Sequence, residues 1–312
     1  MTELRSREQA AVLALCRHAS GPWWNVAQLV EDAGSALAVL EGGPASVETP
    51  ELLERTVPED ARRKAAAELD SFEELIAAEA DRGDRVVTVL DEAYPTNLRL
   101  GYDRPPFLFV RGGLSPASTR ALAVVGTRNA SPEGLEQARR LAEGLARRGV
   151  SVISGLARGI DAAAHEATLA AGGHTVAVMG TGIRLVYPRE HDDLARRIVE
   201  AGGALVSQFF PDSPPTRFRF PLRNRTMSGL ALGTAVVEAS HTSGARMQAR
   251  LALEHGKRVF LVSGLVTREK WAQRMLERPG VTEVSSVDEI LEVIEALERH
   301  SQPQASEQLS LV

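Results

Sequence analysis

The sequence predicts an α/β protein built on a doubly wound, mostly parallel sheet. Uninterrupted apolar runs, typical of strands buried on both faces, recur between residues 121 and 262. Helical segments alternate with these runs, which is the pattern of repeated strand–helix units. In such a sheet the ligand crevice lies outside the carboxyl ends of the strands, so the glycine loops that follow several runs are expected to meet there.

The central strand is expected at residues 121–125, where five apolar residues run into Gly126. Behind it Ser131 can cap a helix whose first position suits Pro132, and the apolar periodicity continues to a stop at Gly149. A strand, a glycine turn and a helix N-terminus together favour an anion site. The reason is that unpaired N–H groups and the positive end of the helix dipole point at one place.

The remaining elements follow from the same periodicities. Further strands are expected at 86–90, 106–110, 150–154, 175–179, 204–207, 235–239, 259–262 and 282–284. Helices are expected at 8–18, 26–41, 58–81, 161–172, 191–201, 245–255, 268–276 and 287–298. The predicted division is a small helical N-terminal domain (1–82), a sheet domain (83–300) and a flexible tail (301–312). The N-terminal helices either pack on the sheet domain or contact DNA.

Composition excludes several classes of function. The net charge of −5 does not mark the whole surface for nucleic acid, so only a local basic face could supply such binding. Cys16 is the single cysteine, and no apolar run approaches the length of a membrane span, so we expect a soluble cytoplasmic protein. No CxxC, HExxH, GxSxG or GxGxxG motif is present. We therefore expect no metal, no cofactor and no enzymatic activity.

The strongest candidate site is a cluster of arginine and phenylalanine residues. Four arginines crowd into the segment TRFRFPLRNR: Arg217, Arg219, Arg223 and Arg225. With Arg128 and Arg158 from two glycine loops, six guanidinium groups are expected to line one crevice. The candidates for base stacking are Phe209, Phe218 and Phe220. Cations bind phosphates and each stacked base contributes roughly 1–3 kcal/mol, so the cluster predicts single-strand binding, although any one residue alone is better read as structural.

Several ordered motifs carry a resemblance to a known family: VVGTRNASPEG (124–134), SGLARGIDAAAH (154–165), AVMGTGI with YP (177–188), FPLRNRTMSGLALG (220–233) and VVEA (236–239). They closely resemble the DNA-processing protein A family, also called DprA or Smf, over roughly residues 85–264. The resemblance implies an extended Rossmann fold that binds single-stranded DNA without cutting it. It also implies protection of incoming strands in natural transformation, loading of the recombinase RecA onto them in homologous recombination, and a homodimer.

The motif positions and the clusters above nominate one set of residues for phosphate and DNA binding. These residues are Gly126, Thr127, Arg128, Ser154, Gly155, Arg158, Gly159, Gly180, Thr181, Gly182, Arg217, Arg219, Arg223, Asn224 and Arg225. Most of them lie in the glycine loops or in the arginine-rich segment. The resemblance therefore implies a pocket at the carboxyl edge of the sheet.

Two segments depart from the family pattern. The chain has SGARMQA (243–249) where the family generally reads SGSLxTA, which removes two hydroxyl groups and introduces Arg246 and Met247. After the last long buried strand, Ser263 replaces a proline, and VTREKWAQRML (266–276) replaces a loop that bears glycine and asparagine. We therefore expect the glycine loops that bind phosphate to keep the family's form, and the opposite side of the pocket, formed by these two segments, to differ from it.

Two further hypotheses stay open. The first is a nucleotide-binding sensor or nucleoside-phosphate hydrolase of the related Rossmann superfamily, with phage defence as one setting, in which Glu238 would be the carboxylate of interest. The second hypothesis is that the tail binds the replication sliding clamp, because Gln308, Leu309 and Leu311 resemble the short peptide that docks there.

Asp161 and His165 lie four positions apart on a predicted helix. They are better read as an N-cap and a surface pair than as an acid–base pair.

Overall fold

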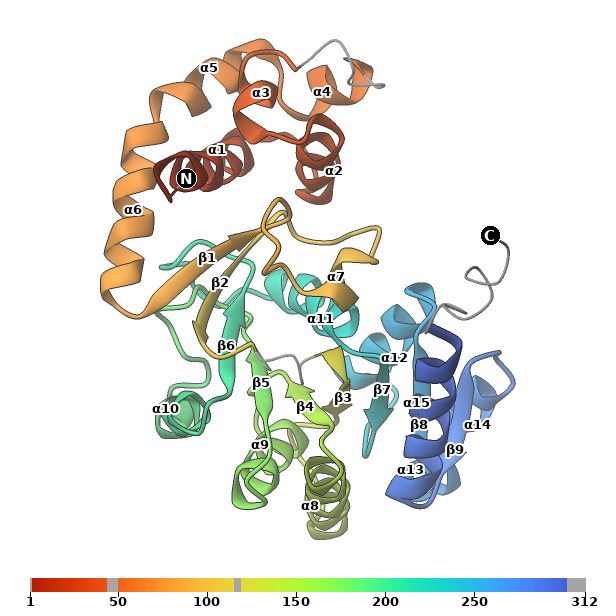
Figure 1. Cartoon of the computed structure of the whole chain (residues 1–312). Coiled ribbons are helices and arrows are strands. Elements are labelled where there is room, and N and C mark those ends of the chain that lie inside the picture. The colour runs from red at the N-terminus through yellow and green to blue at the C-terminus, as the bar shows by residue number, and fades with distance from the viewer. Residues whose placement is uncertain (1, 44–49, 115–118, 302–312) are drawn as a thin grey trace, which may run out of the picture.

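The computed structural model describes residues 2–43, 50–114 and 119–301, and within these ranges the strands form a single nine-stranded sheet (Figure 1). The strand order is β1–β2–β6–β5–β4–β3–β7–β8–β9. The β1–β2 and β2–β6 pairs are antiparallel, and the other neighbours are parallel. The strands are β1 (Asp84–Thr88), β2 (Phe107–Gly112), β3 (Ala121–Val125), β4 (Ser151–Ser154), β5 (Thr175–Val178), β6 (Ala204–Ser207), β7 (Gly233–Val236), β8 (Arg258–Val262) and β9 (Val281–Val284). The predicted doubly wound, mostly parallel sheet is confirmed.

Helices precede the sheet and alternate with its strands. The N-terminal group is α1 (Thr2–His18), α2 (Trp24–Ala33), α3 (Ala36–Leu40), α4 (Pro50–Thr56), α5 (Glu59–Ala67) and α6 (Leu69–Asp81). The later helices are α7 (Thr96–Arg99), α8 (Pro132–Arg147), α9 (Ile160–Ala170), α10 (Asp192–Glu200), α11 (Arg219–Leu230), α12 (Gly244–Glu254), α13 (Ser263–Arg268), α14 (Lys270–Leu276) and α15 (Val287–Ser301). No helix in the described ranges combines the length and the apolar character that a membrane span needs.

Strand order reverses beside β3. From β3 the chain builds outward through β4, β5 and β6 on one side, and then returns to place β7, β8 and β9 on the other side. A reversal of this kind is a topological switch point, where the loops at the carboxyl ends of two neighbouring strands diverge and leave a crevice. The switch point of this sheet therefore lies between the loops that follow β3 and β7.

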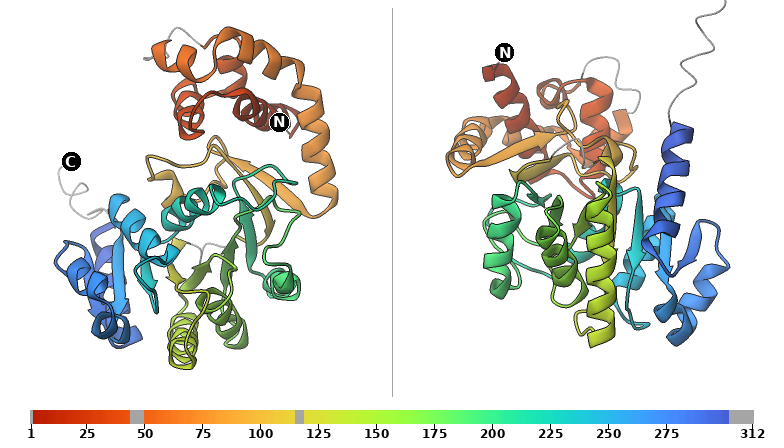
Figure 2. Two further views of the ribbon diagram at one scale, coloured as in Figure 1. Left: turned by 180° about the vertical axis from the view of Figure 1, so that it is seen from behind. Right: turned by 60° about the horizontal axis from the view of Figure 1, so that its bottom comes forward.

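The two faces of β3 belong to two hydrophobic clusters. Leu122 and Val124 are buried with apolar side chains of α8, α9 and α15. The alternate residues Ala121, Ala123 and Val125 are buried in a larger cluster that includes side chains of α11 and α12. This alternation follows from the two-residue period of a strand, and Figures 1 and 2 show α8 and α9 on the opposite side of the sheet from α11.

The N-terminal helices pack on the antiparallel edge of the sheet. Side chains of α1, α2 and α6 belong to the same buried cluster as those of β1 and β2. The Gln9 amide donates to the Val86 carbonyl oxygen at 3.1 Å, and the Trp23 ring lies 5.3 Å from that of Phe107. Packing on the sheet domain is therefore a role of these helices. The predicted domain division at 82/83 falls in the turn between α6 and β1.

Some predicted helices are divided, and four helices were not predicted: α4, α7, α11 and α13. The predicted helix at 26–41 breaks at Gly34, whose φ of 67° is left-handed, and Ser35 caps α3 through the N–H of Ala38. The prediction at 58–81 likewise covers two helices, α5 and α6, whereas the prediction at 268–276 corresponds to α14. No helix was predicted for the arginine-rich segment, which forms α11. Its buried face carries polar side chains, among them Arg223 and Asn224, so the apolar periodicity that identifies a helix is absent.

We expect Leu122→Ala to lower the free energy of unfolding by about 2–5 kcal/mol, because Leu122 is fully buried between β3 and its covering helices. Leu100→Ala is the matched control, since Leu100 is 77% exposed and its truncation should change stability by less than about 0.5 kcal/mol. Urea denaturation of both variants measures the difference. Equal losses would contradict the assignment of β3 to the core.

Candidate functional site

Two adjoining cavities lie at the switch point, and together we call them the crevice. The first, of about 340 Å³, is bounded by the loop after β3, by α11 and by the segment after β7. The second, of about 350 Å³, is bounded by the loop after β4 and by the segment 186–190. Both are lined by Arg128, Ala157, Phe220 and Arg223. The crevice is therefore continuous along the carboxyl edge of the sheet.

Arg223 is the buried cation of the crevice. Its side chain comes from α11, the residue is only 5% exposed, and a Cβ on Gly155 would lie 1.2 Å from its Nη1 atom, so only glycine leaves room there. Burial lowers the pKa of the Arg223 guanidinium; the charge of Asp161 opposes this effect and that of Arg128 adds to it. Within the described residues, Nε of Arg223 and the side-chain amide of Gln248, which also lines the crevice, have no hydrogen-bond partner. These atoms are also buried, so they are unpaired polar groups within the wall of the crevice.

A second cation and an aromatic ring accompany Arg223. The guanidinium of Arg128 lies 5.3 Å from the centre of the Phe220 ring, within the range of a cation–π interaction. A Cβ on Gly180 would come within 2.7 Å of the Phe220 ring, so this glycine allows the ring to lie against the loop after β5. The Tyr187 ring lies 5.9 Å from Phe220 on the other side. The crevice thus combines two guanidinium groups with aromatic surface.

Two carboxylates of the chain accept hydrogen bonds from backbone N–H groups next to the starts of α8 and α9. Glu238 accepts hydrogen bonds from the backbone N–H of Ser131, at 3.2 Å, and from its hydroxyl, at 2.7 Å. Asp161 accepts from the N–H of Gly155 at 3.1 Å. The expected anion site at the start of α8 is therefore wrong, because Glu238 already fills that position. Ser131 caps α8 through the N–H of Gly134, and Glu238 holds this cap residue. Among the described residues no three His, Cys, Asp or Glu side chains are grouped to hold a metal ion.

The six arginines do not share one crevice. Arg128, Arg158 and Arg223 line it, and Arg158 is held by Glu190 at 2.6 Å. Arg219 and Arg225 line a separate cavity of about 360 Å³, which Trp23, Trp24 and Phe209 also line. This segment is helical, and residues two apart on a helix face different directions, so Arg223 and Arg225 diverge. The prediction of a single arginine-lined crevice is corrected to two sites on opposite sides of α11.

The outer arginines have their own partners. Arg225 forms an ion pair with Asp103, and its guanidinium lies 5.9 Å from the Trp24 ring. Arg219 lies 5.5 Å from the ring of Phe209, which is only 3% exposed and so offers no free face for a base. Arg217 lies 5.7 Å from Phe218, which is 75% exposed outside the crevice. Of the three predicted stacking residues, only Phe220 lines the crevice.

Several other predicted residues support the crevice from behind. The hydroxyl of Ser154 is fully buried and donates to the Val124 carbonyl oxygen at 2.6 Å, and that of Thr181 donates to the Leu185 carbonyl. A Cβ on Gly182 would lie 2.1 Å from the Pro211 carbonyl oxygen, and one on Gly159 would lie 2.4 Å from that of Thr127. These groups are therefore engaged in packing, whereas the following predicted residues do line the crevice: Gly126, Thr127, Arg128, Gly155, Arg158, Arg223 and Asn224. Gln308, Leu309 and Leu311 lie outside the described residues.

Some crevice residues were missed from the sequence. Ser240, Thr242 and Ser243 follow β7, and Arg189 follows the Tyr187–Pro188 pair. They lie on loops or in a single short turn of 3-10 helix, where periodicity gives no signal, and the YP motif of the family resemblance ends one residue before Arg189. Their positions depend on which loops the sheet brings together.

A buried Asp–His–Ser series lies behind the crevice. His255 Nε2 is 2.8 Å from Asp103 Oδ1, and His255 Nδ1 is 3.0 Å from Ser228 Oγ. The order matches that of a hydrolytic triad. Ser228 is only 1% exposed and lies within α11, so a substrate cannot reach its hydroxyl. The series therefore links α11, α12 and the β1–β2 connection as a structural element.

Comparisons with known proteins place these motifs in a family. The sequence model of the family described as DNA recombination-mediator protein A matches residues 85–295. The chain is 45% identical over 202 residues to protein Smf of Escherichia coli, a match that covers 64% of this chain and 54% of that protein. It is 35% identical over 217 residues to DNA processing protein DprA of Bacillus subtilis, covering 67% and 73% of the two chains. The match thus spans just over half the length of the Escherichia relative.

Solved structures agree with the sequence matches. DNA processing protein A from Streptococcus pneumoniae superimposes with a TM-score of 0.61 at 31% identity, over 75% of this chain and 84% of that one. The protein from Helicobacter pylori, described as having a unique single-stranded DNA binding mode, has a TM-score of 0.59 at 24% identity over 69% and 96% of the two chains. The Helicobacter structure shows that the fold is shared.

His165 provides a test of how the site's scaffold responds to acid. The predicted surface pair is wrong, because Asp161 and His165 are both buried, and His165 Nδ1 lies 2.7 Å from Thr175 Oγ1. Burial, with added repulsion from His191 and Arg223, lowers the pKa of His165 from 6.5 to about 3. Between these values the unfolded chain binds the extra proton, so acid stabilises the unfolded state.

We therefore expect the free energy of unfolding of the wild type to fall as the pH drops from about 6.5 towards 3. The fall should be steeper than that of His165→Gln by up to about 1.4 kcal/mol per pH unit. Denaturant titrations across this range measure the two slopes. His241→Gln, at an exposed histidine, is the control and should keep the wild-type slope. Identical slopes in the wild type and His165→Gln would show that His165 does not carry this dependence.

Proposed function

This chain belongs to the DNA recombination-mediator protein A family, and from that membership and the crevice we propose that it binds single-stranded DNA without cleaving it. The observation that carries the proposal is the meeting of Arg128, Arg223 and Phe220 in one crevice. Guanidinium groups bind phosphate oxygens, and an aromatic ring offers a face to any base, so the combination suits a strand of any sequence.

The burial of Arg223 strengthens this interpretation. A guanidinium removed from water interacts more strongly with a phosphate than an exposed one does, since the surrounding dielectric is lower. Arg223 is fixed by the close approach of Gly155, and no described acceptor bonds its Nε. We therefore assign Arg223 to the firm anchoring of one phosphate, and Arg128 to a neighbouring contact.

The shape of the crevice favours a strand over a free nucleotide. Each of the two cavities has the volume of a site for one small ligand, and they share four lining residues, so consecutive nucleotides of one strand fit the pair. Hydrolysis of a nucleotide gains no support from Glu238, whose carboxylate is bound by Ser131. A sensor of free nucleotides remains the second hypothesis, and the competition experiment below separates the two.

The family membership supports a wider role, which we also propose. The bound strand would be protected and passed to the recombinase RecA in homologous recombination and natural transformation, within the cytoplasm, by a homodimer of this chain. The tail residues Gln308, Leu309 and Leu311 would add a contact with the sliding clamp. Each of these partners is separable by experiment from strand binding itself.

We expect Arg128→Gln to weaken binding of a short oligonucleotide and to make the dependence of log K on log salt shallower by about 0.7, the effect of one lost phosphate contact on a single strand. Fluorescence anisotropy at several salt concentrations measures both quantities. Arg140→Gln, an exposed change on α8 that removes the same charge, is the control and should leave the slope unchanged. A slope that shifts equally in both variants would argue against a contact in the crevice.

Nucleoside monophosphates should not displace the oligonucleotide at micromolar concentration, because each one replaces a single phosphate contact of a strand that makes several. A competition titration with the four deoxynucleoside monophosphates and with cyclic nucleotides tests this. Displacement by one of them at low micromolar concentration, with little affinity for the oligonucleotide, would favour the nucleotide sensor.

A further inference from the structure

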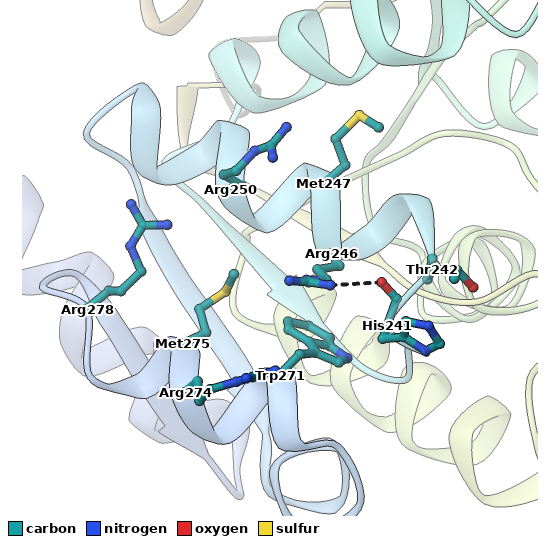
Figure 3. A pocket seen from close by; sticks show the side chains of 10 residues that line it. His241, Thr242, Arg246, Met247, Arg250, Trp271, Arg274, Met275 and Arg278 are labelled. Carbon is teal, nitrogen blue, oxygen red and sulfur yellow. Dashed lines mark hydrogen bonds between the residues drawn. The ribbon is translucent and has the colours of Figure 1, made fainter.

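A second basic surface lies next to the crevice, between α12 and α14 (Figure 3). We call it the α12–α14 groove; its volume is about 580 Å³, larger than either cavity of the crevice. Arg246 and Arg250 come from α12, and Arg274 and Arg278 come from α14 and the residues just after it. Four guanidinium groups thus line one groove in a protein whose net charge is −5.

These charges are weakly compensated. None of the side chains that line the groove is a carboxylate, and in the described part of the chain Arg274 and Arg278 form no ion pair. Arg250 approaches Glu254 at 3.5 Å, a pair in which both side chains are exposed. Arg246 donates to the carbonyl oxygen of His241 at 3.0 Å. Since surface pairs of this kind contribute little, the groove keeps a net positive field.

The floor of the groove is rigid. Trp271 is only 4% exposed, and its indole N–H donates to the Ala239 carbonyl oxygen at 3.0 Å. This bond ties α14 to the segment that follows β7, which also bounds the crevice. The Arg246 guanidinium lies 5.9 Å from the centre of the Trp271 ring. Figure 3 shows the two side chains next to each other, so the ring supports a cation instead of offering a face to a base. The groove is therefore suited to phosphates more than to bases.

The groove continues from the crevice. Thr242 and Ser243 line both, and Ser243 caps the start of α12 through the N–H of Ala245 at 3.2 Å. A polymer that leaves the crevice across these two residues enters the groove directly. A free nucleotide or a separate acidic protein would occupy one site only, so the connection between the two sites favours a polymer.

We propose that the α12–α14 groove holds the phosphate backbone of the same single strand after it leaves the crevice. The inference rests on the proposed function, because it extends the strand that the crevice binds. Its arginines come from or adjoin the two segments that depart from the family pattern, 243–249 and 266–276. The added contacts would therefore be a property of this chain, and would lengthen the stretch of strand that one molecule covers.

The test compares oligonucleotides of two lengths. One of about six nucleotides fills the crevice alone, and one of about twenty also reaches the groove, in keeping with known site sizes. The groove variant is Arg274→Gln/Arg278→Gln. The matched control is Arg55→Gln/Arg63→Gln, which removes the same charge from two exposed arginines of the N-terminal helices. Anisotropy titrations at several salt concentrations give the affinity and the salt slope of each.

With the long oligonucleotide, the groove variant should bind more weakly, and its salt slope should be shallower than the wild-type slope by about 1.4, or about 0.7 for each of two phosphate contacts. With the short one it should match the control. If the wild type binds both and the groove variant equals the control at both lengths, the inference fails while the proposed function stands.

Two other results would also overturn the inference. If the groove variant binds both oligonucleotides more weakly by the same factor, the groove makes the primary contact with the strand and does not extend the crevice. Tighter binding of a glutamate decamer than of a thymidine oligonucleotide of equal charge, with this preference lost in the groove variant, would identify the groove as a protein-docking surface. Failure of the wild type to bind either oligonucleotide would overturn the proposed function as well, and so is distinguishable from failure of the groove alone.

Discussion

The burial of one guanidinium group organises the site. Arg223 is placed inside the protein where α11 crosses the carboxyl edge of the sheet, and an unpaired buried charge is costly unless other charges and dipoles offset the loss of water. Asp161 supplies the opposing charge, and its own pKa is raised by burial although Arg223 and backbone N–H groups act to lower it. Gly155 supplies the space. Strand, loop and helix therefore depend on one another at this point, and a change in any of them displaces the cation.

The helical conformation of α11 determines how the arginines are used. A loop could direct every guanidinium of the segment into one crevice, but a helix directs Arg223 towards the switch point and Arg225 towards Asp103 and the N-terminal helices. The same segment thus contributes one side chain to the candidate binding site and another to the attachment of the N-terminal helices. This division explains why a dense arginine cluster yields only a few cations in the crevice.

The carboxyl edge of the sheet joins the crevice and the α12–α14 groove into one basic path. Carboxylates of the chain occupy the N-termini of α8 and α9, so the positive charge along this path comes from arginine side chains more than from helix dipoles. Side-chain cations can follow a flexible polymer, whereas a helix terminus recognises a single anion. The geometry accordingly suits a strand, and the Phe220 ring lies beside the Arg128 cation within the crevice.

The sequence by itself determined the sheet, because the apolar runs of β3, β4 and β5 and the glycines that follow them are local signals of buried strands and tight loops. It also determined the family, through motifs that are contiguous in the chain. Only the tertiary structure decided which arginines meet: α11 carries no apolar periodicity, so its helical form comes from packing against β3 and α12. Only the tertiary structure likewise showed that Glu238 binds the cap residue of α8, that Ser154 and Thr181 are buried, and that Arg246 and Arg274 line one groove. The physical reason is that these contacts join residues far apart in the chain, whose distance is determined by the order of the strands.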